Sequence, residues 1–321
     1  MKDSYGRTID YLRLSITDRC NLRCRYCMPE GCQWLPMEEI LTLEELTAVA
    51  QIAAELGIHK LKVTGGEPLV RRGCMGLISS LKALSGIEQV TLTTNGVLLA
   101  RYAAALRQAG LDGVNISLDT LDPVTYADIT GFDALSEVID GLVAAMEQGL
   151  RVKVNAVLQQ GVNEDHWPAL VELSRNRAID VRFIEMMPIG WGRGLHSLPN
   201  DALRRKMEAA YGPLTPDSSV HGNGPAVYWH ISGFLGSVGF ISAIHGKFCS
   251  TCNRIRLTST GCLKGCLCYE AGEDLRTPLR AGDLDEVRLR FRRLIASKPE
   301  AHCFERLGQV TERREMSKIG G

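Results

Sequence analysis

The chain carries no net charge and contains no long apolar run. Lys plus Arg and Asp plus Glu each total 37 in 321 residues, so no overall field attracts nucleic acid or an acidic membrane surface. The first eight residues are polar, and the most apolar later segment, residues 231–244, is short and interrupted by Gly and Ser. We therefore expect a soluble, cytoplasmic protein that binds neither nucleic acid nor a membrane. Any anionic ligand must be held by locally placed cations.

Internal repeats and low-complexity segments are also missing, and with 45% hydrophobic residues the chain can bury one large core or two smaller ones. Cysteine, in contrast, is abundant, with eleven residues that occur largely in clusters. Without a signal peptide, clustered cysteines indicate thiolate metal ligation in a reducing compartment rather than disulfides.

The first cluster consists of Cys20, Cys24 and Cys27. Three thiolates leave one position open at a four-coordinate iron or cluster site, and chemistry can take place at that position. A structural zinc site would need a fourth ligand close by, but the next candidate, Cys32, lies beyond a Pro and a Gly in a poorly matched register. Three ordinary buried thiols are the alternative, but the residues between these cysteines are too polar for a core segment.

The second cluster contains Cys249, Cys252 and Cys266, with Cys262 and Cys268 nearby. Four of these thiolates would hold zinc in a zinc ribbon, whereas three would hold another iron–sulfur cluster with one open position. The spacing of the cysteines fits both. Arg254 and Arg256 follow the CxxC pair and share one face if that segment is extended. Because guanidinium forks bind phosphate well, the two arginines favour a cluster beside an anion site.

Short strand patterns alternate with helical patterns through the first 187 residues. The predicted strands are 12–17, 60–64, 89–94, 113–118, 151–158 and 180–186, and the predicted helices are 43–56, 74–84, 98–109, 135–148 and 167–177. This alternation predicts right-handed βαβ units and a parallel sheet. Six strands are too few for a closed eight-stranded barrel, so the fold is α/β with either an open, incomplete barrel or a doubly wound sheet.

One face of the predicted sheet is polar in at least five strands. The polar positions are Arg13, Ser15, Thr17, Lys60, Lys62, Thr64, Thr91, Thr93, Asn95, Asn115, Ser117, Asp119, Lys153 and Asn155. Buried parallel strands are normally apolar on both faces. We therefore expect the sheet to curve around a hydrated lumen, with its apolar face turned outward onto the helices. Beyond residue 188 the chain becomes loop-rich, with a helix at 201–211, a hairpin of 226–231 and 236–241, and a helix at 283–297.

Several motifs together resemble the radical S-adenosylmethionine (SAM) superfamily and, within it, the GTP 3′,8-cyclase family of molybdenum cofactor biosynthesis. The resemblance covers nearly the whole chain. It rests on the CxxxCxxC triplet and on the following segments: Gly65-Gly66-Glu67-Pro68, Thr93-Thr94-Asn95-Gly96, Asn115-Ile116-Ser117-Leu118-Asp119, Arg182-Phe183-Ile184-Glu185, the Cys249-Cys252-Cys266 set with Arg254-Ile255-Arg256, and the terminal Gly320-Gly321.

The resemblance implies an incomplete (β/α)6 TIM-type barrel, residues 1–187, and a cluster-binding C-terminal region, residues 188–321. It also implies two 4Fe-4S clusters, one on Cys20, Cys24 and Cys27 and the other on Cys249, Cys252 and Cys266. By the same resemblance, SAM is bound by Tyr26, Gly66, Glu67, Ser117 and Met187. GTP is bound by Arg13, Lys60, Lys62, Thr93, Lys153, Arg182, Arg254, Ile255 and Arg256. The residues implied to act in catalysis are Arg13, Lys153, Arg254, Arg256, Gly320 and Gly321.

The implied reaction begins with one-electron cleavage of SAM to a 5′-deoxyadenosyl radical, which takes hydrogen from C3′ of GTP; C3′ then closes on C8 of the guanine. A cyclic pyranopterin monophosphate synthase downstream, an electron donor such as flavodoxin or ferredoxin, and a homodimer are the implied partners. Lys62 departs from the family, which often carries Arg there, and so lacks the bidentate fork. A peptide-modifying radical enzyme and a non-catalytic zinc-binding protein are the alternatives. The terminal glycines, which we expect at the surface, are flexible enough to enter a narrow site.

Overall fold

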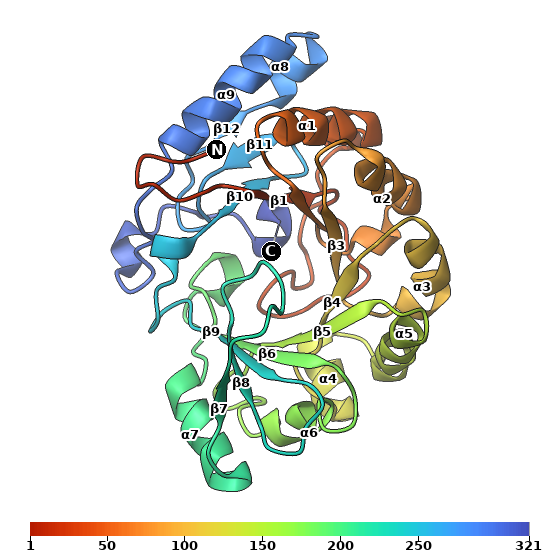
Figure 1. The fold of residues 1–321 in the computed structure, drawn as a ribbon, viewed down its shortest axis with the longest axis vertical. Coiled ribbons are helices and arrows are strands. Elements are labelled where there is room, and N and C mark those ends of the chain that lie inside the picture. The colour runs from red at the N-terminus through yellow and green to blue at the C-terminus, as the bar shows by residue number, and fades with distance from the viewer. Residues whose placement is uncertain (321) are drawn as a thin grey trace.

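Strands and helices alternate from residue 11 to residue 184 in the computed structural model, which describes residues 1–320. The strands are β1 (Tyr11–Ser15), β2 (Lys60–Thr64), β3 (Gln89–Thr94), β4 (Gly113–Ser117), β5 (Arg151–Ala156) and β6 (Asp180–Ile184). Each pairs in parallel with the next along the chain. The intervening helices are α1 (Leu43–Glu55), α2 (Cys74–Ala83), α3 (Leu99–Gln108), α4 (Pro123–Thr130), α5 (Leu135–Glu147) and α6 (Trp167–Glu172). They lie outside the curved row of strands in Figure 1.

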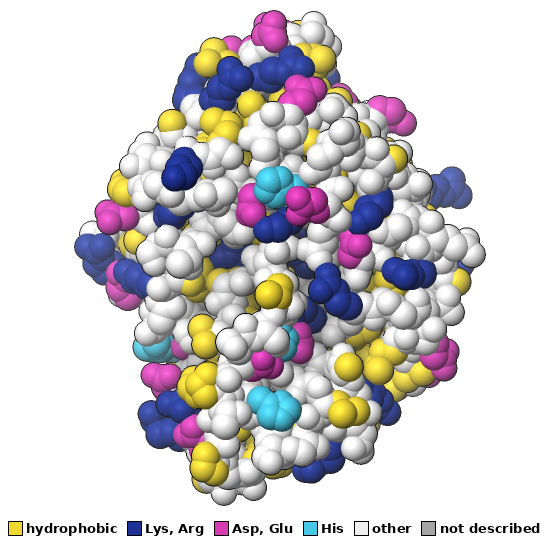
Figure 2. Space-filling model, in the orientation of Figure 1, with side chains coloured by type: hydrophobic (Ala, Val, Ile, Leu, Met, Phe, Trp, Pro, Cys, Tyr) yellow, Lys and Arg dark blue, Asp and Glu magenta, His cyan; other side chains and the backbone are white. Residues whose placement is uncertain are grey.

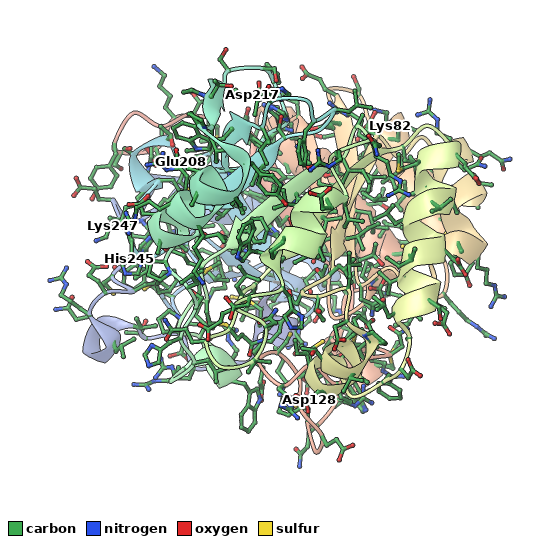
Figure 3. All side chains as sticks on the ribbon, turned by 90° about the horizontal axis from the view of Figure 1, so that it is seen from below. Lys82, Asp128, Glu208, Asp217, His245 and Lys247 are labelled. Atoms are coloured by element: carbon green, nitrogen blue, oxygen red, sulfur yellow. The ribbon has the colours of Figure 1, made fainter. Side chains whose placement is uncertain are left out.

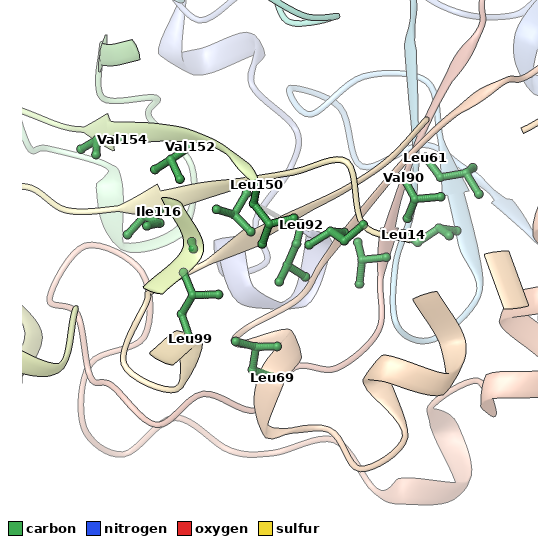
Figure 4. Close-up of a cluster of buried hydrophobic side chains, with 14 of the residues drawn as sticks. Leu14, Leu61, Leu69, Val90, Leu92, Leu99, Ile116, Leu150, Val152 and Val154 are labelled. Atoms are coloured by element: carbon green, nitrogen blue, oxygen red, sulfur yellow. The ribbon is translucent and has the colours of Figure 1, made fainter. Parts of the chain in front are cut away.

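The core lies between this ring of helices and the outer face of the sheet. Strand register aligns one apolar residue from each of five strands in a continuous row: Leu14, Val63, Leu92, Val114 and Val152. All five side chains are at most 4% exposed, and Figure 4 shows much of this layer. Burying each side chain contributes about 1.5 to 3 kcal/mol. Because successive side chains alternate, packing this row outward turns the polar positions inward.

The C-terminal region adds strands to both edges of the sheet. At one edge β9 (Val238–Ile241) pairs in parallel with β6, followed by β8 (Val227–His230) and β7 (Thr215–Asp217). At the other edge β10 (Arg254–Leu257) pairs in parallel with β1, followed by β11 (Cys262–Lys264) and β12 (Glu273–Asp274). The order is β12-β11-β10-β1-β2-β3-β4-β5-β6-β9-β8-β7. Its two ends do not pair within residues 1–320, which confirms an incomplete barrel rather than a closed one.

Four more helices complete the described chain: α7 (Asn200–Tyr211), α8 (Arg276–Arg280), α9 (Leu284–Ala296) and α10 (Met316–Ile319). None of the helices in residues 1–320 is long and apolar enough to cross a membrane. The predicted helix at 167–177 ends at Glu172, and the predicted strand at 151–158 ends at Ala156. Sequence analysis did not predict α4, α8, α10 or the strands β7, β11 and β12, and it considered the segment of β10 only as one that could be extended.

Candidate active site

The lumen of the barrel is lined by cations that the strands bring to one face. They are Arg13 of β1, Lys62 of β2, Arg151 and Lys153 of β5, Arg182 of β6 and Arg254 of β10. Within the described chain no carboxylate lines this cavity. The strand register brings these cations close together: Arg13 lies opposite Lys62 of β2 on one side and opposite Arg256 of β10 on the other. Like charges directly opposite each other destabilise a sheet. Figure 2 shows Lys and Arg side chains recessed near the middle of one face.

Burial and mutual repulsion disfavour the charged forms of Lys62 and of Arg256, which lies opposite Arg13 on β10. Burial, with repulsion from Arg182 and Arg13, holds the pKa of Lys62 well below its usual value. Burial, with repulsion from Arg13 and Arg254, lowers the pKa of Arg256 to about 9. A polyanion in the lumen would relieve both effects. The lumen is therefore a strong local anion site in a chain of zero net charge.

The remaining predicted substrate residues differ in their surroundings. Lys153 Nζ lies 2.7 Å from Asp180 Oδ2, and Arg182 has a buried Nε with no hydrogen-bond partner in the described chain. Lys60 lies at the rim, where its Nζ pairs with Asp10 Oδ2 at 2.6 Å. The side chain of Ile255 is fully buried on the opposite face of β10, so only its main chain can face a ligand. Thr93 lines the same cavity as the cations.

The first cysteine motif occupies the loop after β1, which is attached to the end of α4. Arg23 N donates to Thr130 O at 2.8 Å, and Arg25 N donates to Ile129 O at 3.1 Å. Burial, followed by the neighbouring thiols, raises the pKa of Cys27 to about 12 and that of Cys24 well above its usual value. Such buried thiols ionise only beside a strong positive charge, which an iron–sulfur cluster supplies. The three cysteines therefore fit a cluster.

The Gly65-Gly66-Glu67 segment lies directly against this loop. A Cβ on Gly66 would stand 2.3 Å from Arg19 O, and one on Gly65 would stand 2.6 Å from Thr17 O, so both positions require glycine. The Glu67 carboxylate is buried and accepts hydrogen bonds from Leu69 N, Thr94 Oγ1 and Asn95 N at 2.6 to 2.9 Å. Burial raises the pKa of Glu67 to about 7. Its side chain therefore organises the segment. The main-chain nitrogens of Gly66 and Glu67 donate to Thr17 O and Arg19 O, each at 2.8 Å, so a ligand can meet this segment only at its main-chain carbonyls.

The other predicted SAM residues are spread around the same end of the barrel. Tyr26 donates its hydroxyl to Asp119 Oδ2 at 2.6 Å, and Ser117 is the last residue of β4. Met187, in contrast, lines the cavity that contains the second cysteine triplet. One ligand that contacts all of them must therefore extend from the first cysteine loop toward the second triplet.

The second triplet, Cys249, Cys252 and Cys266, lines a cavity beside Arg254 and Arg256. Burial alone would raise the pKa of Cys252, but Arg254 and Lys298 outweigh it and hold the pKa at about 7. Cys252 can thus ionise readily as a cluster ligand, whereas burial raises the pKa of Cys249, whose ionisation needs the positive charge of the bound iron.

Two extra cysteines of this region belong to an apolar cluster against which Cys266 packs. Cys268 Sγ is 3.4 Å from Cys303 Sγ, and burial raises the pKa of Cys268 to about 12. Cys262 lies on β11. No three His, Cys, Asp or Glu side chains in residues 1–320 converge closely enough to hold a single metal ion.

Gly320 is buried against the carboxyl ends of β1 and β2 and does not lie at the surface as expected. Arg256 Nη1 donates to Gly320 O at 3.0 Å. Gly320 has φ +75°, and a Cβ there would stand 3.0 Å from Ser15 Cβ. Figure 1 shows α10, which precedes it, in the middle of the ring of strands. Gly321, predicted to act with it, lies outside the described residues.

A buried ion pair anchors the segment that leads to Gly320. Lys264 Nζ pairs with Glu312 Oε2, and both side chains are fully buried. Glu312 Oε1 also accepts from the main-chain nitrogens of Arg313 and Arg314 at 3.0 and 2.9 Å. Burial would raise the pKa of Glu312, but Arg314 and Lys264 lower it to about 2. The stabilisation from this carboxylate is therefore present above its unfolded pKa of 4.5 and is lost as the pH falls toward 2.

Replacing Glu312 by Leu is expected to destabilise the protein by about 3 to 5 kcal/mol, because the change leaves Lys264 buried without its ion-pair partner. The apparent Tm of anaerobically purified protein at a fixed scan rate measures the loss. The double variant Lys264→Met/Glu312→Leu should regain much of it. Lys206→Ala, which removes the exposed pair with Asp165, is the control. A wild-type Tm in Glu312→Leu would contradict the assignment.

Sequence analysis missed three residues of the lumen wall, His221, Asn223 and Tyr228, and it also missed Asp180, which pairs with Lys153. Asp180 was within a predicted strand, and its pairing with Lys153 follows from register. His221 and Asn223 lie in a loop rich in Gly and Pro, whose position depends on the strands at its ends. No local pattern in that segment indicates a site.

In comparisons with known proteins, each half of the chain matches the model of a protein family. The model of the Radical SAM superfamily matches residues 14–174, and that of Molybdenum Cofactor Synthesis C matches residues 179–304. The chain is 45% identical to a GTP 3′,8-cyclase of Pelotomaculum thermopropionicum and 45% identical to one of Heliobacterium modesticaldum, with all of both chains covered in each case. A GTP 3′,8-cyclase of Peptoclostridium acidaminophilum is 46% identical over 99% of this chain and 98% of its own.

Among solved structures, Streptococcus suis SuiB bound to S-adenosylmethionine is similar in fold, with a TM-score of 0.64. The match covers 97% of this chain and 78% of SuiB, at 14% sequence identity. At this identity the likeness bears on the fold alone, and it agrees with the incomplete barrel described above.

Proposed function

Because the chain belongs to the GTP 3′,8-cyclase family of the radical SAM superfamily, we propose that it cyclises GTP to 3′,8-cyclo-7,8-dihydro-GTP, the first step of molybdenum cofactor biosynthesis. One observation carries the proposal at the level of residues. The lumen, which shares Arg13 and Arg254 with the cavity of the second triplet, is lined by cations with no carboxylate among the described lining residues. A triphosphate is the ligand that such a charge distribution favours.

Each triplet of cysteines would hold one 4Fe-4S cluster. The first triplet lies in the loop after β1, at the carboxyl ends of the strands, and the second triplet lies beside β10. The cluster of the first triplet, when bound, supplies the reductive cleavage of SAM and hence the radical chemistry at GTP. SAM would lie against the main chain of Tyr26, Gly66 and Glu67, near Ser117, and extend toward Met187. GTP would occupy the lumen, with its purine toward the second cluster.

The residues of the chain bind and orient the two ligands. Arg13, Arg254 and Arg256 lie side by side on β1 and β10 and can share the phosphates and the ribose. Lys62, Lys153 and Arg182 extend the positive surface across the lumen. Thr93 adds a hydroxyl, Ile255 a main-chain contact and Lys60 a rim charge that Asp10 already balances. Holding both reactants in one enclosed geometry is how a protein accelerates such chemistry.

The decisive experiment is an anaerobic assay of 5′-deoxyadenosine release with each nucleoside triphosphate. GTP is expected to give release together with a cyclised product, whereas ATP, CTP and UTP give neither. Equal release with all four nucleotides, or none with GTP in protein that contains iron and acid-labile sulfide, would contradict the proposal.

Replacing Arg256 by Ala is expected to weaken GTP binding by ~1.5 to 3 kcal/mol, the scale of a charge-assisted hydrogen bond. SAM affinity should stay near that of the wild type. Isothermal titration under anaerobic conditions measures both. Arg292→Ala, which removes an exposed arginine of α9, is the matched control. Unchanged GTP affinity in a variant with normal iron content would remove Arg256 from the site.

Other parts of the assignment stay predictions. They are the division of the chain at residue 187, the cytoplasmic location, the homodimer, the electron donor and the downstream cyclic pyranopterin monophosphate synthase. Co-purification with each candidate partner tests the last two.

A further inference from the structure

The loop between β7 and β8, residues 218–225, crosses the amino-terminal end of the lumen. Its residues 222–225 line the cavity together with Gln89, the first residue of β3. A Cβ on Gly222 would stand 3.9 Å from Lys153 Nζ, and one on Gly224 would stand 3.7 Å from Arg182 Nη1. The main chain of the loop therefore lies directly on two of the lumen cations. Figure 1 shows this loop reaching toward the middle of the ring.

His221 forms the first attachment of the loop. Its Nδ1 lies 3.0 Å from Asp180 Oδ2, and its Nε2 lies 2.8 Å from Asp217 Oδ2. The imidazole also stacks on Tyr228, with ring centres 3.9 Å apart. Asp180 Oδ2 accepts a hydrogen bond from Lys153 as well, at 2.7 Å. One carboxylate oxygen thus contacts both the loop and a cation proposed to bind phosphate.

Asn223 forms the second attachment, on the other side of the lumen. Its Nδ2 donates to Gln89 Oε1, a contact that joins the loop to β3. Gly222, with φ +141°, lies between the two attachments in a backbone conformation that favours glycine. Two side-chain contacts and a glycine between them suit a segment that must detach and reattach.

The two ends of the lumen differ in what closes them. At the carboxyl ends of the strands, Gly320 and the first cysteine loop lie against β1 and β2. At the amino ends, the 218–225 loop lies over Lys153 and Arg182. Figure 3 shows the two ends: Asp217, which precedes the loop, lies on the side of the molecule opposite Asp128, whose carboxylate pairs with Arg25 in the cysteine motif.

We propose that the 218–225 loop is a lid that closes over the phosphate end of the substrate, fastened by His221 on Asp180 and Asp217 and by Asn223 on Gln89. This inference rests on the proposed function, since it takes GTP as the occupant of the lumen. A closed lid retains the triphosphate and keeps water from its end of the lumen. Lys153 can turn from Asp180 to a phosphate while Asp180 still holds His221.

The test compares two loop variants with a matched control in anaerobically purified protein that contains both clusters. His221→Phe keeps an aromatic ring on Tyr228 but removes both contacts to carboxylates, and Asn223→Ala removes the contact to Gln89. Each should speed GTP dissociation about 5- to 10-fold, the factor that loss of one net hydrogen bond gives, and leave SAM affinity unchanged. Val220→Ala, whose side chain is 86% exposed in the same loop, should dissociate GTP at the wild-type rate.

Amide hydrogen exchange provides a second measurement that a purely structural role would not change. Exchange in residues 218–225 should slow when GTP is added and stay unchanged when SAM alone is added. The lid is overturned if GTP leaves exchange in this loop unchanged, or if both variants release GTP at the wild-type rate. Wild-type protein with intact clusters that does not bind GTP would overturn the proposed function instead. Wild-type protein that binds GTP, beside loop variants with unaltered dissociation, would overturn the lid alone.

Discussion

Replacing Cys20, Cys24 and Cys27 together by Ala is expected to leave about half of the iron in the protein and to abolish SAM cleavage, because each triplet holds its own cluster. The structure places the first triplet in the loop attached to α4 and the second in the cavity beside Arg254 and Arg256. Within residues 1–320, no hydrogen bond joins the loop of Cys20, Cys24 and Cys27 to the segment of Cys249 and Cys252. Iron and acid-labile sulfide per chain, with 5′-deoxyadenosine release, measure the result.

The reciprocal variant, with Cys249, Cys252 and Cys266 replaced by Ala, should also keep about half of the iron. It should still cleave SAM slowly but form no cyclised product, because the group proposed to orient the purine is missing. Cys74→Ala is the control, since this cysteine is the fully buried first residue of α2 and belongs to neither triplet. Loss of all iron from either triple variant, or zinc in place of iron in the wild type, would show the two-cluster assignment to be wrong.

The part of the fold that could be predicted from the sequence depends on local periodicity. Strands β1 to β6 and their polar faces follow from the period-two alternation, because one side packs on helices and the other faces the lumen. The helix α4 shows where this reasoning fails. Its β-branched residues Val124, Thr125, Ile129 and Thr130 have low helix propensity. Asp122, which caps Thr125 N at 2.7 Å, and the contact with the cysteine loop stabilise a helix that its composition does not indicate.

Contacts between distant segments account for the rest. Sequence analysis gave Arg254 and Arg256 a shared face only if their segment is extended, and in the structure both lie on the strand β10. It could not predict that β10 pairs with β1, some 240 residues earlier, because no local pattern specifies such a partner. That pairing brings Arg256 opposite Arg13 and joins the two halves of the anion site. The contact between His221 and Asp180 depends likewise on β6 and on the β7–β8 hairpin.

The polar alternation nevertheless predicted the position of the lumen before any pairing was known. Arg13, Lys62 and Lys153 occupy inward positions on three different strands. Mutual repulsion between these cations has no structural benefit, and burial disfavours the charged forms of Arg13 and Lys62. Buried residues that lower the stability of the fold in this way are typical of a functional site.

Deleting Gly320 and Gly321 is expected to stop formation of the cyclised product while thermal stability, both clusters and GTP affinity stay almost unchanged. Glycines contribute no side-chain packing, and Ile319, which is fully buried, remains to hold α10. Arg256 loses its contact with Gly320 O and keeps its guanidinium available for phosphate, so binding should not fall. The lumen loses, however, a carbonyl held 3.0 Å from that guanidinium at the carboxyl end of β1.

The variant Gly320→Ala keeps the residue and its carbonyl but adds a Cβ, so it tests whether glycine itself is required at this position. At φ +75° an Ala costs about 1 to 2 kcal/mol, and its Cβ would stand 3.0 Å from Ser15 Cβ, so the segment must move away from β1. Product formation should fall at least tenfold while SAM cleavage continues, as the carbonyl leaves Arg256. Gly308→Ala, where a Cβ meets nothing within 4 Å, is the matched control. Normal turnover in the truncated protein, measured after its iron content has been verified, would contradict this prediction. It would show that Gly320 and Gly321 have no role in turnover and that the contact between Arg256 and Gly320 is only structural.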